Sequence, residues 1–187
     1  MPAAAITTER LLLRRWRSSD RVPFAALNGD PRVMEWFPAP LTREQSDELA
    51  DLIELRMEEQ GYGMWAVEVP GVADFIGFVG LNPADATLGR PAIEVGWRLA
   101  AEHWGRGYAP EGAFASLAYG FDTLGLTEIV ALTSVGNAKS RRVMEKIGMT
   151  YDPADDFDNP RIAPGSPLIR HVLYRVDAPT FARVRAE

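Results

Sequence analysis

The sequence predicts an α/β domain in which helices cover both faces of a mixed β-sheet. Three observations support this prediction: helical segments come early, an antiparallel meander of strands occupies the middle, and strands alternate with helices toward the end. This order gives a sheet with both antiparallel and parallel pairs. The chain has 187 residues, 47% of them hydrophobic, which is enough for one full core, and no repeat, linker or change of composition marks a second. We therefore expect a single domain over residues 1–187.

The N-terminal part predicts one strand and three helical segments. A capping box of Thr42 and Gln45 opens the longest helix, and glycines at 61 and 63 suit its C-terminal end. Before it, prolines and polar residues separate shorter pieces. These are a strand over Glu9–Trp16, a short helix that Ser18–Asp20 begin and Asn28–Pro31 end, and a helical segment over Val33–Phe37.

The middle of the chain reads as a β-meander of three strands, over Met64–Val69, Phe75–Leu81 and Ala92–Leu99. A Pro-Gly turn joins the first two, and a polar loop over residues 82–90 joins the last two. In the last strand apolar residues alternate with Glu94, Gly96 and Arg98, so one side of it faces the core and the other carries charge.

The C-terminal half predicts a long helix and then alternating elements. After Ala109 an apolar stripe at helical spacing runs through Ala113, Phe114, Leu117, Ala118, Phe121 and Leu124, and Gly125 ends it. The expected elements after it are a strand over Glu128–Thr133, a helix over Asn137–Ile147, and strands near Met149–Tyr151 and Ile169–Val176 around a Pro- and Asp-rich loop at Pro153–Pro167.

Composition excludes several kinds of function. The absence of cysteine rules out disulfides, thiolate metal sites and a thiol nucleophile, and the distant pair His103 and His171 does not make a metal site. A net charge of −6 argues against nucleic acid as a partner. No signal peptide is visible, and no apolar run reaches the roughly 18 residues of a membrane span. We expect a cytoplasmic protein without a membrane or metal partner.

A glycine-containing turn before the long helix is the most informative segment. Gly105 and Gly107 let backbone N–H groups approach an anion, the helix N-terminus adds donors, and Arg106 adds charge. The alternative is a tight strand-to-helix turn with no ligand. A dinucleotide fingerprint fails, because Pro110 stands where its third glycine belongs.

Two segments together resemble the GCN5-related N-acetyltransferase (GNAT) superfamily. The superfamily's pyrophosphate loop follows a Gln/Arg-x-x-Gly-x-Gly/Ala pattern, and Trp104–Ala109 matches its last Gly and Ala but carries Trp at the first position. Downstream, Asn137-x-x-Ser140 and Glu145-Lys146-x-Gly148 are similar to the RimJ/RimL-like branch, the ribosomal-protein N-terminal acetyltransferases. The same branch is suggested by Thr8–Arg14, Phe75–Gly77, Gly80–Leu81 and Glu94–Trp97, so the resemblance spans about Thr8 to Met149.

This resemblance implies a GNAT-like sheet with splayed central strands, acetyl-CoA as the donor, a primary amine as the acceptor and no metal. Direct transfer is favoured, since no cysteine exists to carry the acetyl group. The residues implied to bind acetyl-CoA are Trp97, Arg98 and Leu99 through their backbone, the loop residues Trp104, Gly105, Arg106, Gly107, Tyr108 and Ala109, and Asn137 and Ser140.

Two residues are the catalytic candidates. Glu94, on the charged side of its strand, is the first candidate for the base that takes a proton from the amine. Many superfamily members supply a Tyr as the acid, but Met144 stands at that position, and Ser140 is what the RimJ/RimL-like branch offers instead. The alternatives are a structural Glu94 paired with Arg98 or another cation, a helix-surface Ser140 with no role, and Asn137 acting only as a helix N-cap.

The acceptor is the least determined part. Trp36 and Phe37 are candidates for walls of its pocket and His171 for a lining residue, with core packing or hydrogen bonding as the alternative for each. The acidic loop over residues 152–167 either covers the acceptor entrance or is a solvated charge cluster. The leading function is an N-acetyltransferase of a protein N-terminus or small amine, as a monomer or homodimer; the alternative is an acyl-CoA-binding sensor or partner module.

Overall fold

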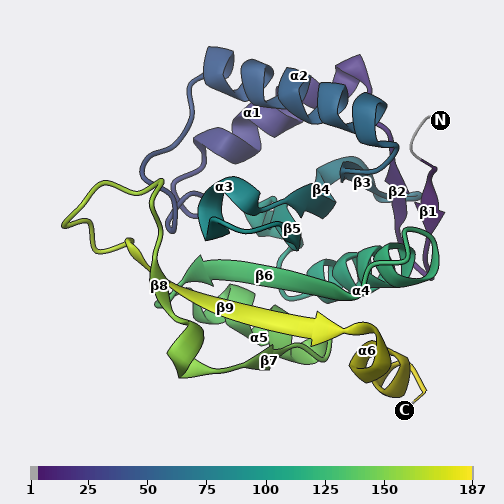
Figure 1. The fold of residues 1–187 in the computed structure, drawn as a ribbon. Helices are drawn as coiled ribbons and strands as arrows, with labels where there is room; N and C mark the ends of the chain where they lie inside the picture. Colours follow the sequence, from purple (N-terminus) through teal and green to yellow (C-terminus); the bar gives the residue numbers. More distant parts are fainter. Residues whose placement is uncertain (1–3, 187) are drawn as a thin grey trace. The chain divides into compact units, whose positions relative to one another are not determined.

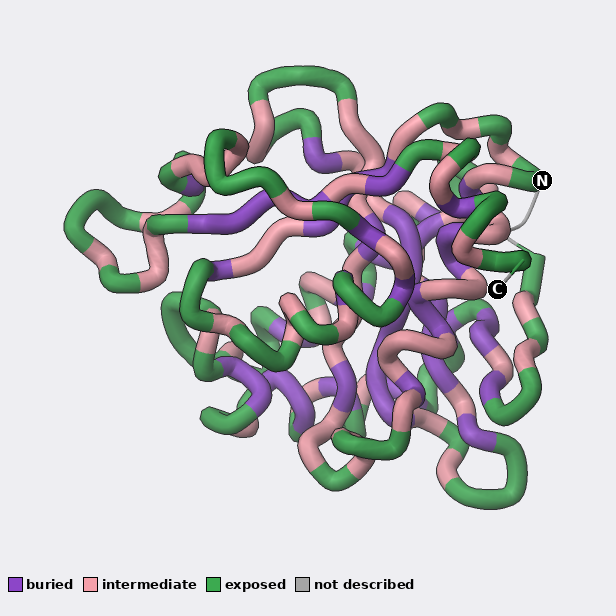
Figure 2. Tube along the Cα trace, turned by 90° about the horizontal axis from the view of Figure 1, so that it is seen from below, coloured by how far each residue is buried: buried purple, intermediate pink, exposed green. Residues whose placement is uncertain are grey.

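A computed structural model describes residues 4–186 and divides the chain into two compact units. The first unit runs to Leu81 and continues from Gly96 to Ser116; the second comprises Asn82–Val95 and the chain from Leu117 onward. Strands β4 (Ala73–Pro83) and β5 (Ile93–Leu99) and helix α4 (Tyr108–Asp122) contribute residues to both. Buried residues, purple in Figure 2, follow the strands of each unit.

The first unit contains an antiparallel ladder in the order β1-β2-β3-β4-β5. The strands are β1 (Ile6–Thr7), β2 (Leu12–Arg14), β3 (Met64–Val69), β4 (Ala73–Pro83) and the end of β5. The meander is thus confirmed, but the strand predicted over Glu9–Trp16 is only three residues long. The reason is a turn, in which Leu11 N–H donates to Thr8 Oγ1 (2.9 Å) and folds β1 back onto β2.

Two helices, α1 (Arg21–Gly29) and α2 (Arg43–Gln60), lie side by side in the first unit (Figure 1). The single turn η1 (Ser18–Asp20) leads into α1. The capping box is confirmed: Thr42 Oγ1 accepts from Gln45 N–H at 3.2 Å and Gln45 Oε1 accepts from Thr42 N–H at 2.9 Å. Gly61, with φ 74°, ends α2 as expected.

The helix predicted over Val33–Phe37 is wrong, because this segment forms consecutive turns. The N–H groups of Val33 and Met34 both donate to Asp30 O at 3.0 Å, and that of Phe37 donates to Met34 O. A proline disfavours helical backbone at the residue before it, and Pro38 follows directly. The six residues between Pro31 and Pro38 are also too few to offset the cost of helix nucleation.

The second unit contains the start of β5 and four further strands. Strand β6 (Glu128–Ser134) pairs parallel with β5 at Glu94 and Val130, and antiparallel with β9 (Arg170–Asp177). Strands β7 (Thr150–Tyr151) and β8 (Phe157–Asp158) both pair with β9. The sheet of the chain is therefore mixed, as predicted, and strand β8 lies inside the segment expected to be a loop.

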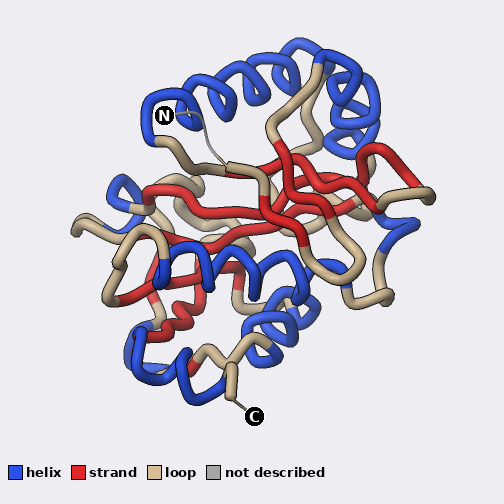
Figure 3. The backbone as a smooth tube through the Cα atoms, turned by 90° about the vertical axis from the view of Figure 1, so that its right-hand side faces the viewer, coloured by secondary structure: helices blue, strands red, loops and turns tan. Residues whose placement is uncertain are grey.

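The helices of the second unit include α5 (Ala138–Lys146), close to its predicted bounds, and two that the sequence did not suggest, α3 (Asp85–Leu88) and α6 (Ala178–Val184). Helix α6 packs through Phe181 on Phe121, with ring centroids 5.1 Å apart. Short turns η2 (Ala101–His103), in the first unit, and η3 (Pro153–Asp155) complete the elements drawn in Figure 3. Over residues 4–186, no helix has the length and apolar character to cross a membrane.

The buried face of helix α4 differs from the apolar stripe that the sequence predicts. Ala113 and Leu117 are buried as expected, but Phe114 and Phe121 are only half-buried, and small residues such as Gly112 are buried instead. A Cβ on Gly112 would lie 3.3 Å from Val79 on β4. The helix therefore approaches β4 closely through its small residues, which a hydrophobic stripe cannot reveal.

Candidate active site

The glycine turn of the first unit has the backbone that an anion cradle needs. Gly105 and Gly107 have φ of 74° and 82°, values that side chains disfavour, and α4 begins directly afterward at Tyr108. The first N–H groups of a helix have no partner inside it, and they carry its positive dipole end. Arg106 is exposed and forms no ion pair with the described residues, so its charge is available to an anion.

An N-terminal arginine holds this turn in place, which sequence reasoning missed. Arg10 Nη1 donates to Arg106 O at 2.9 Å, and its guanidinium lies 5.1 Å from the ring centre of Tyr108. Glu111 on α4 pairs with Arg10 at 2.6 Å and accepts from Thr8 Oγ1 at 2.6 Å. The N-terminal segment is thus held against the turn by residues about 100 positions away in the sequence. The only sequence feature that indicated this contact was the Thr8–Arg14 motif.

The residues between β5 and the turn are ordered by backbone contacts. Trp104 Nε1 donates to Leu99 O at 2.8 Å. Gly77 on β4 has φ 133°, and a Cβ there would lie 2.2 Å from Arg98 O, so β4 passes very close to the end of β5. Leu99 is buried and Trp97 half-buried, which leaves backbone groups as their predicted means of binding acetyl-CoA.

Glu94, in the second unit, has the electrostatics of a base that works near neutral pH. Burial raises the pKa of this carboxyl to about 7, although the Asn82 side chain, which donates to Glu94 Oε1 at 3.4 Å, and the positive charge of Arg161 both act to lower it. Asn82 and Arg161 were not anticipated as partners. Of the cations that the structural alternative for Glu94 allows, Arg161 is the one that acts on this carboxyl, whereas the Arg98 side chain donates to Asn28.

Asn137 and Ser140 form a local unit at the start of α5. Asn137 Oδ1 accepts from Ser140 N–H at 3.2 Å, so the N-cap interpretation of Asn137 is confirmed. Asn137 Nδ2 donates to Thr133 Oγ1 at 2.9 Å and to Ser140 Oγ at 3.1 Å. Since Ser140 Oγ accepts from Asn137, its own hydrogen is left to donate elsewhere. Met144, by contrast, is 2% exposed and offers no hydroxyl.

His171 is engaged on both ring nitrogens. Nδ1 lies 3.1 Å from Ile169 O and Nε2 lies 3.2 Å from Asn159 Nδ2, a pattern that fits a neutral ring protonated on Nδ1. Burial lowers the pKa of His171, against the opposing effect of the Ile169 carbonyl. The hydrogen-bonding alternative therefore describes what His171 does here, which is to fasten the loop over residues 152–167 to β9.

Two of the four aspartates of the acidic loop are paired with arginines of β9. Asp155 pairs with Arg175 at 2.5 Å and Asp158 with Arg170 at 3.3 Å. These pairs reduce the negative charge expected to attract a cationic acceptor. The loop instead brings the positive charge of Arg161 toward Glu94.

The aromatic pair predicted to wall the acceptor pocket is not core. Phe37 is 39% exposed and Trp36 is half-buried, so core packing does not account for Phe37. The guanidinium of Arg98 lies 4.2 Å from the ring centre of Phe37 and hydrogen-bonds Asn28 Oδ1 at 2.6 Å. The first unit therefore joins one of the predicted acceptor residues to the end of β5.

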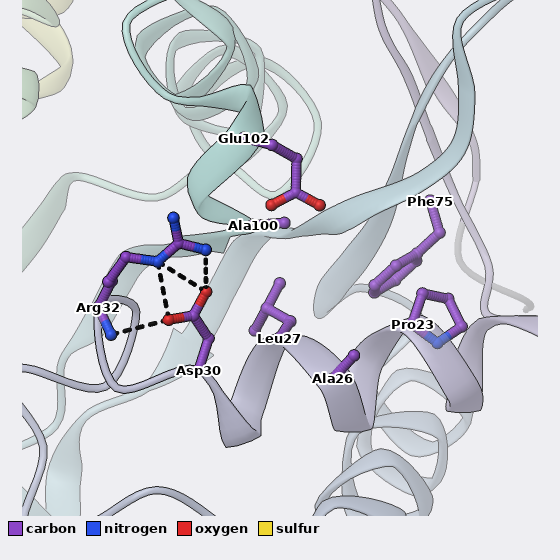
Figure 4. Close-up of a pocket in the computed structure, with 8 residues that line it drawn as sticks. All are labelled: Pro23, Ala26, Leu27, Asp30, Arg32, Phe75, Ala100 and Glu102. Carbon is purple, nitrogen blue, oxygen red and sulfur yellow. Dashed lines mark hydrogen bonds and ion pairs between the residues drawn. The ribbon is translucent and has the colours of Figure 1, made fainter.

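Two hollows of the surface are separate from these groups. Figure 4 shows one of about 260 Å³ in the first unit, with the Asp30–Arg32 ion pair at one end (2.6 Å). Its lining residues are Pro23, Ala26, Leu27, Asp30, Arg32, Phe75, Ala100 and Glu102. The other, of about 350 Å³, lies on α5 against Ala138, Arg141, Arg142 and Glu145. Neither contains a predicted site residue.

A carboxyl that titrates near neutral pH and a glycine turn that opens a helix are both features of a transferase with a phosphate-bearing donor. Residues 10–150 match the family described as Acetyltransferase (GNAT) domain. The chain belongs to this family and is an acetyl-CoA-dependent N-acetyltransferase.

Individual relatives agree with this assignment. The chain is 33% identical to the uncharacterized protein YkkB of Bacillus subtilis over 78% of its own length and 85% of YkkB. It is 32% identical to the FsC-acetyl coenzyme A-N(2)-transacetylase of Aspergillus fumigatus over 67% of its length and 56% of that protein. An acetyltransferase structure from Agrobacterium tumefaciens superposes with a TM-score of 0.76 at 27% identity, over 94% of this chain and 95% of that one.

Proposed function

We propose that the protein transfers the acetyl group of acetyl-CoA directly to a primary amine, with Glu94 as the general base. The observation that carries this proposal is a half-buried carboxyl on β5 whose pKa lies at about 7. A lysine-type amine has a pKa near 10.4 and an α-amino group one near 7.7–8.0, so either must lose a proton before or during attack. A carboxylate matched to neutral pH accepts that proton, directly or through a water.

Ser140 is the proposed acid for the leaving thiolate. The amine nitrogen attacks the thioester carbonyl, a tetrahedral intermediate forms, and the C–S bond then breaks. The hydroxyl of Ser140 accepts from Asn137 and keeps its hydrogen to donate, so it is able to protonate the departing sulfur. Asn137 acts as a positioning residue, because it holds both the backbone and the hydroxyl of Ser140.

The donor's pyrophosphate is proposed to bind at the Gly105–Gly107 turn. The two positive φ angles, the N-terminus of α4 and the unpaired Arg106 support this assignment. The backbone of Trp97–Leu99 is proposed to hold the pantetheine arm. The clamp of Arg10 on the turn supports the RimJ/RimL-like branch, since Thr8 and Arg10 belong to the motif that suggests it.

The acceptor is proposed to be a protein N-terminus or a small amine. The name of the A. fumigatus relative describes transfer to a nitrogen, which agrees with an amine acceptor here. Trp36 and Phe37 are the proposed pocket walls, and the partial exposure of both supports this role. For His171, whose ring nitrogens are already engaged, a contact with the acceptor stays a prediction.

The test measures CoA release from acetyl-CoA over a panel of amines, beside calorimetric titration of acetyl-CoA. We expect release that depends on the amine, and we expect Glu94→Gln to lower kcat by about 100-fold or more with the Kd for acetyl-CoA unchanged. Binding without amine-dependent release would favour the acyl-CoA-binding module. An unchanged kcat in E94Q would remove Glu94 from the mechanism.

A further inference from the structure

Arg98 is held rigidly by buried polar groups. Its Nη1 donates to Asn28 Oδ1 at 2.6 Å, and Asn28 Nδ2 donates in turn to Ser46 Oγ at 2.9 Å. Asn28 lies on α1 and Ser46 on α2, and both are fully buried. Three elements of the first unit therefore fix the position of one guanidinium.

Two aromatic rings flank the same guanidinium. The ring centre of Phe37 lies 4.2 Å from its central carbon and that of Phe78 lies 5.4 Å away. Phe78 is buried, whereas Phe37 is 39% exposed. Arg98 is thus enclosed on the inner side and bordered by an exposed aromatic ring on the other.

No carboxylate neutralises this charge within residues 4–186. The buried Nε of Arg98 has no hydrogen-bond acceptor there, and no acidic side chain forms an ion pair with Arg98. Burial lowers its pKa to about 10, which leaves the group charged at neutral pH. A buried cation without a counter-ion is costly, so a site of this kind is completed by an anion from elsewhere.

The surroundings of Arg98 in the first unit indicate which molecule brings the anion. Phe37, whose ring centre lies 4.2 Å from the guanidinium carbon, is a proposed wall of the acceptor pocket. An acceptor that binds beside Phe37 is therefore within range of Arg98.

We propose that Arg98 binds a carboxylate of the acceptor, and that the acceptors are small amino carboxylates rather than polyamines. This inference rests on the proposed function and names its substrate class. The guanidinium forms a charge-assisted hydrogen bond to the carboxylate through Nη2, and Phe37 covers the bound group. Two of the four aspartates of the acidic loop are already paired with β9, which weakens the attraction of the loop for cationic acceptors.

The test compares matched acceptors, each an amino carboxylate and its carboxamide, with one to five carbons between amine and carboxyl. For the unaltered enzyme we expect kcat/KM to favour the carboxylate by about 10- to 100-fold at the best spacing, the range for hydrogen bonds to charged groups. Arg98→Met is expected to abolish this preference, and Arg98→Lys to retain part of it, both measured at saturating acetyl-CoA. Arg43→Met, which removes a surface arginine paired with Asp47, is the control that keeps the preference.

The outcomes separate this inference from the proposed function. Amine-dependent CoA release at equal kcat/KM for both members of every pair would overturn the role of Arg98 alone. The same holds if R98M folds, binds acetyl-CoA and keeps the preference. If no amine supports CoA release, the proposed function fails and the inference fails with it. Since the ratio for the unaltered enzyme needs no variant, an R98M protein that does not fold leaves the inference open to refutation.

Discussion

Two arginines of the first unit are withdrawn from solvent, and their surroundings are opposite. Arg14, 5% exposed, pairs with Asp20 at 2.8 Å and with Glu68 at 2.7 Å. The hydrogen bond that Arg14 donates to Asp20 and the other contacts with these carboxylates outweigh burial and raise the pKa of Arg14. Arg98 has two aromatic rings and an amide in place of carboxylates, and burial lowers its pKa.

The difference between the two arginines lies in whether the protein itself supplies a counter-ion. Arg14 joins β2, the η1 turn and β3, so its counter-ions are part of the fold. Arg98 is positioned as firmly, yet its counter-ion is absent from the described chain. The charge of Arg14 is completed by the fold and serves stability, whereas that of Arg98 has only neutral partners and is the one we propose to bind a ligand.

The largest expected effect is on stability and falls on Arg14. Arg14→Met leaves the buried carboxylate of Asp20 without a cation and leaves Glu68 with Arg17 alone, which costs about 3–5 kcal/mol of unfolding free energy. Urea denaturation followed by circular dichroism measures this loss. A loss no larger than that of Arg98→Met would break the comparison.

A smaller effect is expected on chemistry at α5. Ser140→Ala removes the proposed acid but keeps the helix N-cap, because Asn137 Oδ1 accepts from the backbone N–H of residue 140. We expect kcat to fall by about 100-fold, with the midpoint of thermal unfolding nearly unchanged. Turnover equal to that of the unaltered enzyme, at the same acetyl-CoA affinity, would show that Ser140 is not the acid.

The glycine turn supplies a third prediction, at the level of donor binding. Arg10→Met releases the turn from the N-terminal segment and is expected to raise the Kd for acetyl-CoA by about tenfold, a change of about 1.4 kcal/mol. At saturating acetyl-CoA, kcat should stay the same. Arg15→Met, which breaks only an exposed contact with Glu58, is the matched control and should leave the Kd unchanged.

The smallest expected effect completes the comparison. Arg98→Met leaves one neutral acceptor, Asn28 Oδ1, without its donor but also removes an uncompensated charge. Because these two contributions oppose one another, the unfolding free energy should change by about 1 kcal/mol or less. A loss as large as that of Arg14→Met, measured under the same conditions, would make Arg98 a structural residue.

Local signals in the sequence predicted much of the fold. Thr42, Gln45 and Gly61 bound α2 through contacts with residues three or four positions away, and the meander follows from alternating side chains. Val33–Phe37 was wrong because helical spacing alone ignores the effect of Pro38. The buried face of α4 was missed because it depends on how closely Val79 approaches Gly112, which only the folded chain determines.

In the candidate site, too, the local features were predicted from the sequence and the long-range contacts were not. Gly105, Gly107 and Asn137 stand where motifs predicted a turn and a helix start. The contacts that give the site its chemistry join distant positions: Arg10 to Glu111, Asn28 to Arg98. No spacing rule reaches across 70 or 101 residues, so these partners became visible only in the structure.

The pH dependence of kcat/KM tests the central role of Glu94 most directly. Because the pKa of Glu94 is raised to about 7, the base is charged above that pH and is lost as the pH falls through it. We predict a break near pH 7 that stays in place for two acceptors with different amine pKa values and disappears in Glu94→Gln. A break that moves with the amine, or one that persists in E94Q, would contradict the assignment of Glu94 as the base.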